Sequence, residues 1–173
     1  MKKIYHDWQQ IERWSKRIAL DILKTDWRPD YIVGLTRGGL IPATIISHTL
    51  DVPMYTLKVA LRDGDTECNA WMAEDAYGWI PSDNDLAKMV AKKNILIVDD
   101  INDTGATFEW IKKDWPASCL PKDPAWNNVW HGNVKFAVLV NNLASSESID
   151  WCATDINKIE EPCWVVFPWE QDD

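Results

Sequence analysis

The most informative segment of the sequence for the fold is VDDINDTGAT, residues 98–107. It continues the apolar run Ile95–Val98, which is typical of a buried parallel strand, and it precedes Phe108–Ile111, which indicates the opening of a helix. We therefore expect a strand-to-helix turn at the carboxyl edge of an open α/β sheet. Ligands bind at this edge, and the backbone amides that open a helix suit an anionic phosphate.

The polar groups of this turn come in an order that suits a sugar phosphate. Asp99 and Asp100 can accept hydrogen bonds from vicinal sugar hydroxyls and hold Mg²⁺ through their oxygens. Thr104, Gly105 and Thr107 supply hydroxyls and free backbone amides, which are the groups that bind phosphate. The turn is therefore predicted to bind a ribose 5-phosphate, the alternative being an ordinary acidic turn between a strand and a helix.

Composition and charge narrow the class of protein. The chain has 173 residues, 46% of them hydrophobic, so a single domain over residues 1–173 is expected. Its net charge of −9 disfavours nucleic acid as a partner. No apolar stretch reaches about 18 residues and the first residues lack the apolar core of a signal peptide, so we expect a cytoplasmic protein without membrane contact. The four cysteines have neither zinc-site nor disulfide-framework spacing.

Strands and helices are expected to alternate along the chain. Apolar spacing and turn residues predict helix 7–24, strand 31–35, helix 40–50, strand 54–59, helix 82–91, strand 95–98, a helix from 108 to near 115, and strand 134–140. Such alternation predicts the α/β class, with an open, mostly parallel sheet flanked by helices. Right-handed crossovers would place the turns that follow the strands on one edge of that sheet.

A second turn with ligand-binding character follows the strand at 31–35. It reads GLTRGGLIPA, residues 34–43, and combines two adjacent glycines, an arginine and the start of a helix. Gly38 and Gly39 let a ligand approach the backbone, while Arg37 adds a forked cationic donor. The turn is predicted to bind a polyanion, the alternative being a glycine turn with a surface arginine.

The acidic stretch resembles the PRPP-binding motif of the type I phosphoribosyltransferases, two acidic residues followed by Asp-Thr-Gly-x-Thr. The resemblance covers most of the chain and is strongest to the bacterial xanthine-guanine and hypoxanthine enzymes. It implies the type I fold, with a small hood built from the chain ends, and Mg²⁺ held directly or through water by Asp99 and Asp100. It also implies Asp103 as the general base. The residues that would hold the ribose and 5-phosphate of PRPP are Asp99, Asp100, Thr104, Gly105, Ala106 and Thr107.

The family resemblance also assigns the glycine turn and the intervening segment. In the family the turn binds the pyrophosphate of PRPP and often contains a cis peptide bond, for which the candidate is Thr36–Arg37. Residues 58–81 would form a flexible lid that excludes water, with Arg62 as a contact to pyrophosphate. A solvated acidic loop is the alternative for that segment. The implied pyrophosphate ligands are Thr36, Arg37, Gly38, Gly39 and Arg62.

Base recognition is implied at the carboxyl end, in the segment EPCWVVFPWE, residues 161–170. Trp164 matches the aromatic residue that stacks on the purine, and Val165 matches the residue that gives backbone contacts. Asn142 stands where purine enzymes usually carry a lysine that contacts the exocyclic oxygen of a 6-oxopurine, and its amide can donate to the same oxygen. A 6-oxopurine is the expected base, while adenine, a pyrimidine or a modified base stay open, as does a purely structural Trp164.

Residues 115–133 contain three prolines and several tryptophans without periodicity, and we interpret them as an insertion that contacts another subunit of a homo-oligomer, a dimer or tetramer. The predicted function is transfer of the 5-phosphoribosyl group from PRPP to a nucleobase, with release of pyrophosphate. A nucleotide-sensing regulator or a non-catalytic binder on the same fold are the alternatives. A nucleotidase or kinase is disfavoured because the chain lacks a Gly-x-x-x-x-Gly-Lys-Ser/Thr loop.

Overall fold

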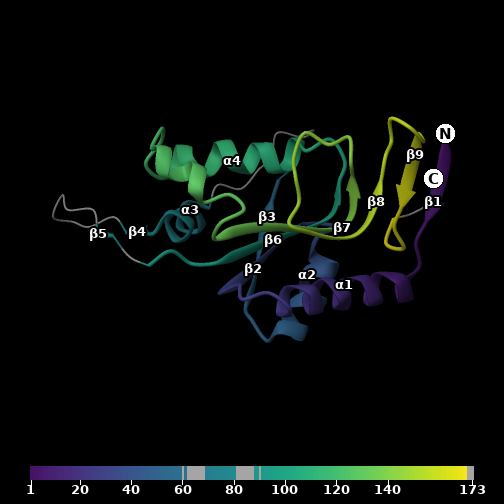
Figure 1. Cartoon of the computed structure of the whole chain (residues 1–173), viewed down its shortest axis with the longest axis horizontal. Coiled ribbons are helices and arrows are strands. Elements are labelled where there is room, and N and C mark those ends of the chain that lie inside the picture. The colour runs from purple at the N-terminus through teal and green to yellow at the C-terminus, as the bar shows by residue number, and fades with distance from the viewer. Residues whose placement is uncertain (60, 62–68, 81–87, 90, 171–173) are drawn as a thin grey trace.

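The fold is that of an open parallel sheet with helices on both faces, shown by a computed structural model that describes residues 1–59, 61, 69–80, 88–89 and 91–170 (Figure 1). The central sheet has five strands in the order β3-β2-β6-β7-β8, all parallel to their neighbours. The elements are β1 (Lys2–Tyr5), α1 (Trp8–Leu23), β2 (Tyr31–Thr36), α2 (Leu40–Leu50), β3 (Met54–Lys58), α3 (Ala70–Tyr77), β4 (Trp79–Ile80), β5 (Lys88–Met89), β6 (Ile95–Asn102), α4 (Ala106–Ser118), a 3-10 helix η1 (Pro124–Asn128), β7 (Val134–Asn142), β8 (Trp151–Ile156) and β9 (Cys163–Val166).

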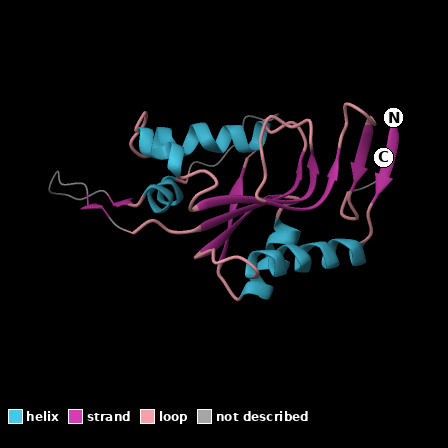
Figure 2. Cartoon of the chain, in the orientation of Figure 1, coloured by secondary structure: helices cyan, strands magenta, loops and turns pink. Residues whose placement is uncertain are grey.

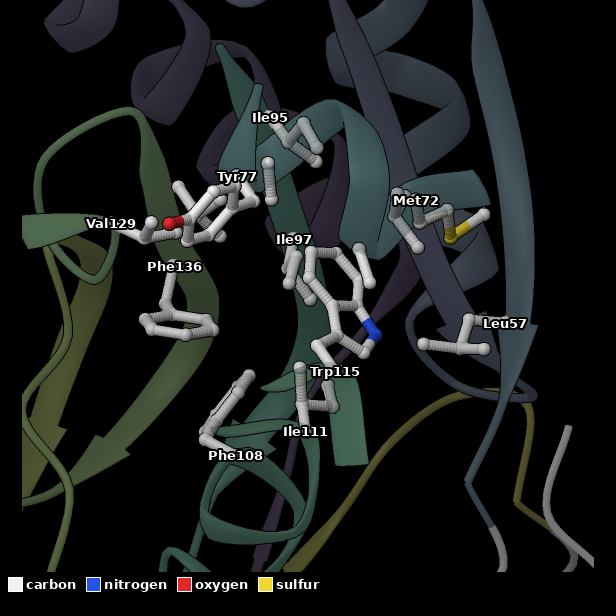
Figure 3. Packing of buried hydrophobic residues seen from close by; sticks show 14 of the residues in the cluster. Leu57, Met72, Tyr77, Ile95, Ile97, Phe108, Ile111, Trp115, Val129 and Phe136 are labelled. Carbon is white, nitrogen blue, oxygen red and sulfur yellow. The ribbon is translucent and has the colours of Figure 1, made fainter. Parts of the chain in front are cut away.

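Two hydrophobic cores fill the space on either side of the sheet. Helices α1 and α2 cover one face, and α3 and α4 cover the other (Figure 2). Phe108, Ile111 and Trp115 point from α4 toward the strands, where they pack with Ile97 and Phe136 (Figure 3). Because both faces are covered, the central strands are apolar without alternation, which is why β6 and β7 could be found from the sequence.

The first helix follows its local signals closely. The Asp7 carboxylate accepts a hydrogen bond from the Gln10 amide at 2.8 Å, which caps the helix, and Lys24 ends it. Ile11, Ile18 and Ile22 are fully buried against the sheet, as their spacing predicts. The predicted helix over 7–24 is confirmed, and so is the α/β class.

Strand β6 is longer than predicted, which changes where the acidic residues lie. It runs to Asn102 because Asp99, Ile101 and Asn102 still pair with residues of β7. Asp99 and Asp100 therefore belong to the end of the strand, and the turn begins only after Asn102. Pairing with the distant strand β7, which local sequence patterns do not report, extends β6.

Two further boundaries differ from the sequence prediction. Residues 88–89 form strand β5, which pairs antiparallel with β4, so the helix predicted over 82–91 does not include them; residues 82–87 and 90 lie outside the described residues. Residues 70–77 of the predicted lid form helix α3, in which Met72, Ala73 and Ala76 are buried. These residues belong to the core, so the predicted lid over 58–81 has to be shorter.

The two ends of the chain form a separate small sheet. Strand β1 pairs in parallel with β9, which brings both termini to one end of the molecule (Figure 1). This sheet is the hood that the resemblance implies. Strands β1 and β8 had no clear sequence signal, because each is short and only partly buried.

The tryptophan-rich segment 115–133 packs within the chain. Helix α4 continues through Pro116 to Ser118, and Trp115 and Trp126 are almost fully buried in the core that α4 covers. Trp130 stacks on Trp126, with ring centroids 5.6 Å apart. Trp115 and Trp126 therefore belong to the chain's own core, and the subunit contact predicted for this segment stays a prediction for its exposed residues. No helix in the part of the chain that the structure describes combines the length and apolarity that crossing a membrane requires.

Candidate active site

The end of β6 holds two neighbouring carboxylates in a partly buried position. The Asp100 amide donates a hydrogen bond to the Asp99 carboxylate at 2.9 Å. Burial raises the pKa of Asp99 well above its usual range, and the adjacent Asp100 charge raises it further. Burial also raises the pKa of Asp100 to about 6, with a smaller contribution from the negative charge of Glu170. Burial therefore disfavours full ionisation of the pair, which a bound cation would favour.

This acid pair could hold a hard cation. No ion pair joins either carboxylate to another described residue, and the described residues contain no cluster of three or more metal-ligating side chains. Mg²⁺ commonly binds one or two carboxylates and completes its shell with water and substrate phosphate oxygens. Asp99 and Asp100, next to the turn predicted to bind phosphate, fit that requirement.

The turn after β6 forms a cradle at the start of α4. Residues 99–108 line a cavity of about 250 Å³. Gly105 adopts φ 95°, and a Cβ at this position would overlap the Ser146 hydroxyl. The Ser146 amide in turn donates to the Thr104 carbonyl at 3.1 Å, so the loop after β7 supports the turn from behind. The predicted phosphate ligands Thr104, Gly105, Ala106 and Thr107 are thus brought together around one opening.

The glycine turn lies directly against the acid pair. A Cβ on Gly38 would overlap the Asp100 carboxylate, and one on Gly39 would meet the Val98 carbonyl at 2.5 Å. The Thr36–Arg37 peptide bond is cis, as the resemblance implies, and Arg37 is exposed. The prediction that both turns share one edge of the sheet is therefore confirmed, and the contact between them is close enough to require glycine. Arg62 lies outside the described residues.

Asp103 has a cationic partner that the sequence analysis missed. Its carboxylate lies 2.9 Å from the ammonium nitrogen of Lys158, which follows β8. The Lys158 nitrogen is also 5.9 Å from the ring centroid of Trp164, whose side chain is 48% exposed. A lysine six positions before Trp164 was visible in the sequence, but its contact with Asp103, which is 55 residues away, was not.

Asn142 lies at the centre of this group but is used by the protein itself. Its side-chain nitrogen donates to the Asp103 carbonyl at 2.9 Å, and its side-chain oxygen accepts hydrogen bonds from the amides of Ala144 and Lys158. This use of the amide favours a positioning role over the direct base contact predicted for Asn142. Val165 is buried in β9, where its partner across the terminal sheet is Ile4.

Comparison with known proteins agrees with the geometry. Residues 1–172 match the family described as phosphoribosyl transferase domain. The xanthine-guanine phosphoribosyltransferase of Cereibacter sphaeroides is 28% identical over 98% of this chain and 87% of its own length, and that of Desulfotalea psychrophila is 26% identical over 94% and 83%. The crystal structure of a purine phosphoribosyltransferase from Pyrococcus horikoshii covers 100% of this chain and 97% of its own, with 26% identity and a TM-score of 0.65. With the acid pair, the phosphate cradle and the glycine turn at one edge of its sheet, the chain belongs to the phosphoribosyl transferase domain family.

Proposed function

We propose that this protein transfers the 5-phosphoribosyl group from PRPP to a purine base in nucleotide salvage, releasing pyrophosphate. The contact between Gly38 and the Asp100 carboxylate carries the proposal, because it places a polyanion-binding turn beside a ribose phosphate cradle. PRPP is a ribose 5-phosphate that carries a pyrophosphate on its anomeric carbon, so it needs both turns at once. Family membership and the relatives named as purine phosphoribosyltransferases support the same substrate pair.

The residues of the two turns have separate tasks in binding PRPP. The amides that open α4, with the hydroxyls of Thr104 and Thr107, hold the 5-phosphate. The amides of Gly38 and Gly39, with the Arg37 guanidinium, hold the pyrophosphate. Asp99 and Asp100 accept hydrogen bonds from the ribose hydroxyls and would hold Mg²⁺, which when bound neutralises charge on the leaving pyrophosphate.

Transfer breaks the bond between the anomeric carbon and pyrophosphate and forms a bond from that carbon to a ring nitrogen of the base. The nitrogen becomes a nucleophile as the base loses a proton, and Asp103 is the residue that accepts it. Two observations support this role: Asp103 lines the phosphate cradle, and its partner Lys158 lies 5.9 Å from the ring centroid of Trp164. The electron-poor sugar that forms is stabilised by the surrounding carboxylates.

The base is expected to stack on Trp164. Its exposed indole offers a flat apolar face near the Lys158 ammonium, and stacking of this kind contributes about 1–3 kcal/mol per base. A 6-oxopurine such as hypoxanthine, xanthine or guanine is the base we favour, on the strength of Trp164 and the β9 segment. A cytoplasmic location and a homo-oligomeric assembly stay predictions from the sequence and the resemblance.

One assay tests the proposal directly. The purified chain is incubated with PRPP, Mg²⁺ and a panel of purine and pyrimidine bases, and pyrophosphate release is measured for each. We expect release with at least one 6-oxopurine, and loss of that release when EDTA removes the metal. Failure with every base in the presence of Mg²⁺ would contradict the proposal and favour a binder or a nucleotide-sensing regulator.

A further inference from the structure

The side chain that connects the proposed general base with the proposed stacking platform is Lys158. Its ammonium nitrogen lies 2.9 Å from the Asp103 carboxylate and 5.9 Å from the ring centroid of Trp164. Only 20% of the Lys158 side chain is exposed, against 42% for Asp103 and 48% for Trp164. The cation is therefore the most enclosed member of a group whose other two members face the solvent.

The backbone of Lys158 is fixed by a buried amide, so its position is not that of a free surface lysine. The Asn142 side chain is 6% exposed and accepts a hydrogen bond from the Lys158 amide at 3.1 Å. Its nitrogen donates to the Asp103 carbonyl at 2.9 Å, and more weakly to the Asp103 carboxylate at 3.4 Å. One amide at the end of β7 thus sets the separation between Asp103 and Lys158, since it binds the backbone of both.

An ammonium group in this place has hydrogen atoms left to donate. Lys158 has three N–H groups, and Asp103 is the one described side chain with which it forms an ion pair. A flat base stacked on the indole of Trp164 would lie within reach of both the ammonium and the carboxylate. The protein then offers a cationic donor and an anionic acceptor side by side along one edge of that base.

This pair of groups matches one class of purine. In a 6-oxopurine the exocyclic oxygen accepts hydrogen bonds and lies next to a ring nitrogen that can carry a proton. Adenine has an amino group in place of the oxygen, so the ammonium would face a donor at that position and could not form the corresponding hydrogen bond. A hydrogen bond from a charged donor is also stronger than one from the neutral amide of Asn142.

We propose that Lys158 selects the base: its ammonium donates to the exocyclic oxygen of a 6-oxopurine stacked on Trp164, while Asp103 faces the neighbouring ring nitrogen. Asn142 is then a positioning residue, which orients Lys158 and Asp103 without touching the base. This inference rests on the proposed transfer to a purine and specifies how the base is chosen. It assigns the recognition of the oxygen to a side chain after β8, in place of the residue at the end of β7.

The test compares base preference in the wild type and three variants of the full chain. Lys158→Met removes the charge but keeps a side chain of similar length beside Trp164, and Lys158→Arg restores a cationic donor. Lys24→Met is the matched control, because Lys24 forms a surface ion pair with Asp21 on α1, away from the site. For each form, kcat/KM is measured with hypoxanthine, guanine and adenine, together with KM for PRPP and the thermal unfolding midpoint.

We expect Lys158→Met to lower kcat/KM for hypoxanthine and guanine by roughly 10- to 100-fold, the loss of one charge-assisted hydrogen bond. The value for adenine and the KM for PRPP should change by less than about threefold, so the preference for oxopurines over adenine falls at least tenfold. Lys158→Arg should recover part of that preference, and Lys24→Met should match the wild type. Equal losses with all three bases, or an unchanged preference, would overturn the inference.

A binding measurement separates this inference from the proposed function. If the wild type releases no pyrophosphate with any base, the proposed function fails, and the affinities for IMP and AMP are measured by calorimetry instead. The inference still requires the wild type to bind IMP at least tenfold more tightly than AMP, and Lys158→Met to lose that difference. Equal affinity of the wild type for the two nucleotides would overturn it. Should Lys158→Met unfold at a lower temperature than the control, Lys158→Gln, which is neutral but still polar, is compared in its place.

Discussion

The acid pair at the end of β6 and Asp103, three residues further along the chain, present the same functional group in opposite settings. Asp99 and Asp100 are partly buried, form no ion pair with any described residue, and have raised pKa values. Asp103 is more open and has the Lys158 ammonium at 2.9 Å. The surroundings of the carboxylates thus differ: the acid pair has no cationic partner among the described residues and could take one from outside, whereas Asp103 is paired with a lysine of the protein itself.

We expect the largest loss of turnover when Asp103 is replaced. Asp103→Asn removes the proton acceptor and keeps the shape of the side chain, so turnover should fall by roughly 10²- to 10⁴-fold. The affinity for PRPP with Mg²⁺ should change by less than about threefold, because the acid pair is intact. Pyrophosphate release and calorimetry with PRPP measure the two quantities. Asp21→Asn, on the exposed face of α1, is the control, and an unimpaired turnover in Asp103→Asn would rule out the assigned role.

Replacement of one member of the acid pair should weaken the binding of PRPP. Asp100→Ala removes a carboxylate that would hold Mg²⁺ and the ribose hydroxyls, so the affinity for PRPP in the presence of Mg²⁺ should fall by roughly 10- to 100-fold. Turnover at saturating PRPP should fall less than in Asp103→Asn. Calorimetric titration with PRPP at fixed Mg²⁺ gives the affinity. An affinity equal to that of the wild type would remove Asp100 from the binding site.

How much of this site could be predicted follows the same division between local and distant contacts. The carboxylates, the phosphate cradle and the glycine turn were predicted because each is a short stretch whose residues share one task. The helix over 7–24 was predicted for the same reason, since Asp7 and the spacing of its isoleucines act within a few turns. Local signals thus sufficed to predict which residues meet at this edge of the sheet.

The residues proposed to bind the base meet through contacts between distant segments, which local sequence patterns do not report. Lys158 meets Asp103 across 55 positions, and Asn142 meets Asp103 across 39. The end of β6 at Asn102 depends likewise on pairing with Asn141 of β7. No periodicity or spacing reports such pairs, so the sequence suggested that Asn142 would contact the base and did not reveal Lys158.

The raised pKa of Asp100 predicts that the affinity for PRPP depends on pH, with a smaller effect than that of either substitution. The pKa of Asp100 is about 6, so below this pH the group holds a proton that a cation must displace. The affinity of the wild type for PRPP with Mg²⁺ should therefore strengthen as the pH rises through 6, and weaken by up to about tenfold per pH unit below it. PRPP has phosphates that titrate in the same range, and Asp100→Asn controls for them. Identical pH profiles for the two proteins would show that the carboxylate does not contribute.

The free energy of unfolding should change least, and it should change in opposite directions when Asp100 and Asp103 are replaced. The folded pKa of Asp100 is raised above its usual value of 3.8, so its ionisation opposes folding: stability from this group falls as the pH rises from about 4 through 6. In the absence of Mg²⁺, Asp100→Asn should therefore raise the free energy of unfolding at pH 7 by on the order of 1–2 kcal/mol. At pH 4 the advantage should largely vanish, because the wild-type side chain is then protonated as well.

Asp103→Asn should shift stability in the other direction. It removes the partner of a partly buried ammonium, so the free energy of unfolding should fall, by at most about 1 kcal/mol since Asp103 is 42% exposed. Urea unfolding of both variants and the wild type at pH 7 and pH 4 measures the two changes side by side. Opposite signs at pH 7 mean that the acid pair is held at a cost to the fold, which binding of a cation relieves, whereas Asp103 is stabilised by a residue of the protein itself. Shifts of the same sign would show that the two sets of carboxylates do not differ in the way their surroundings indicate.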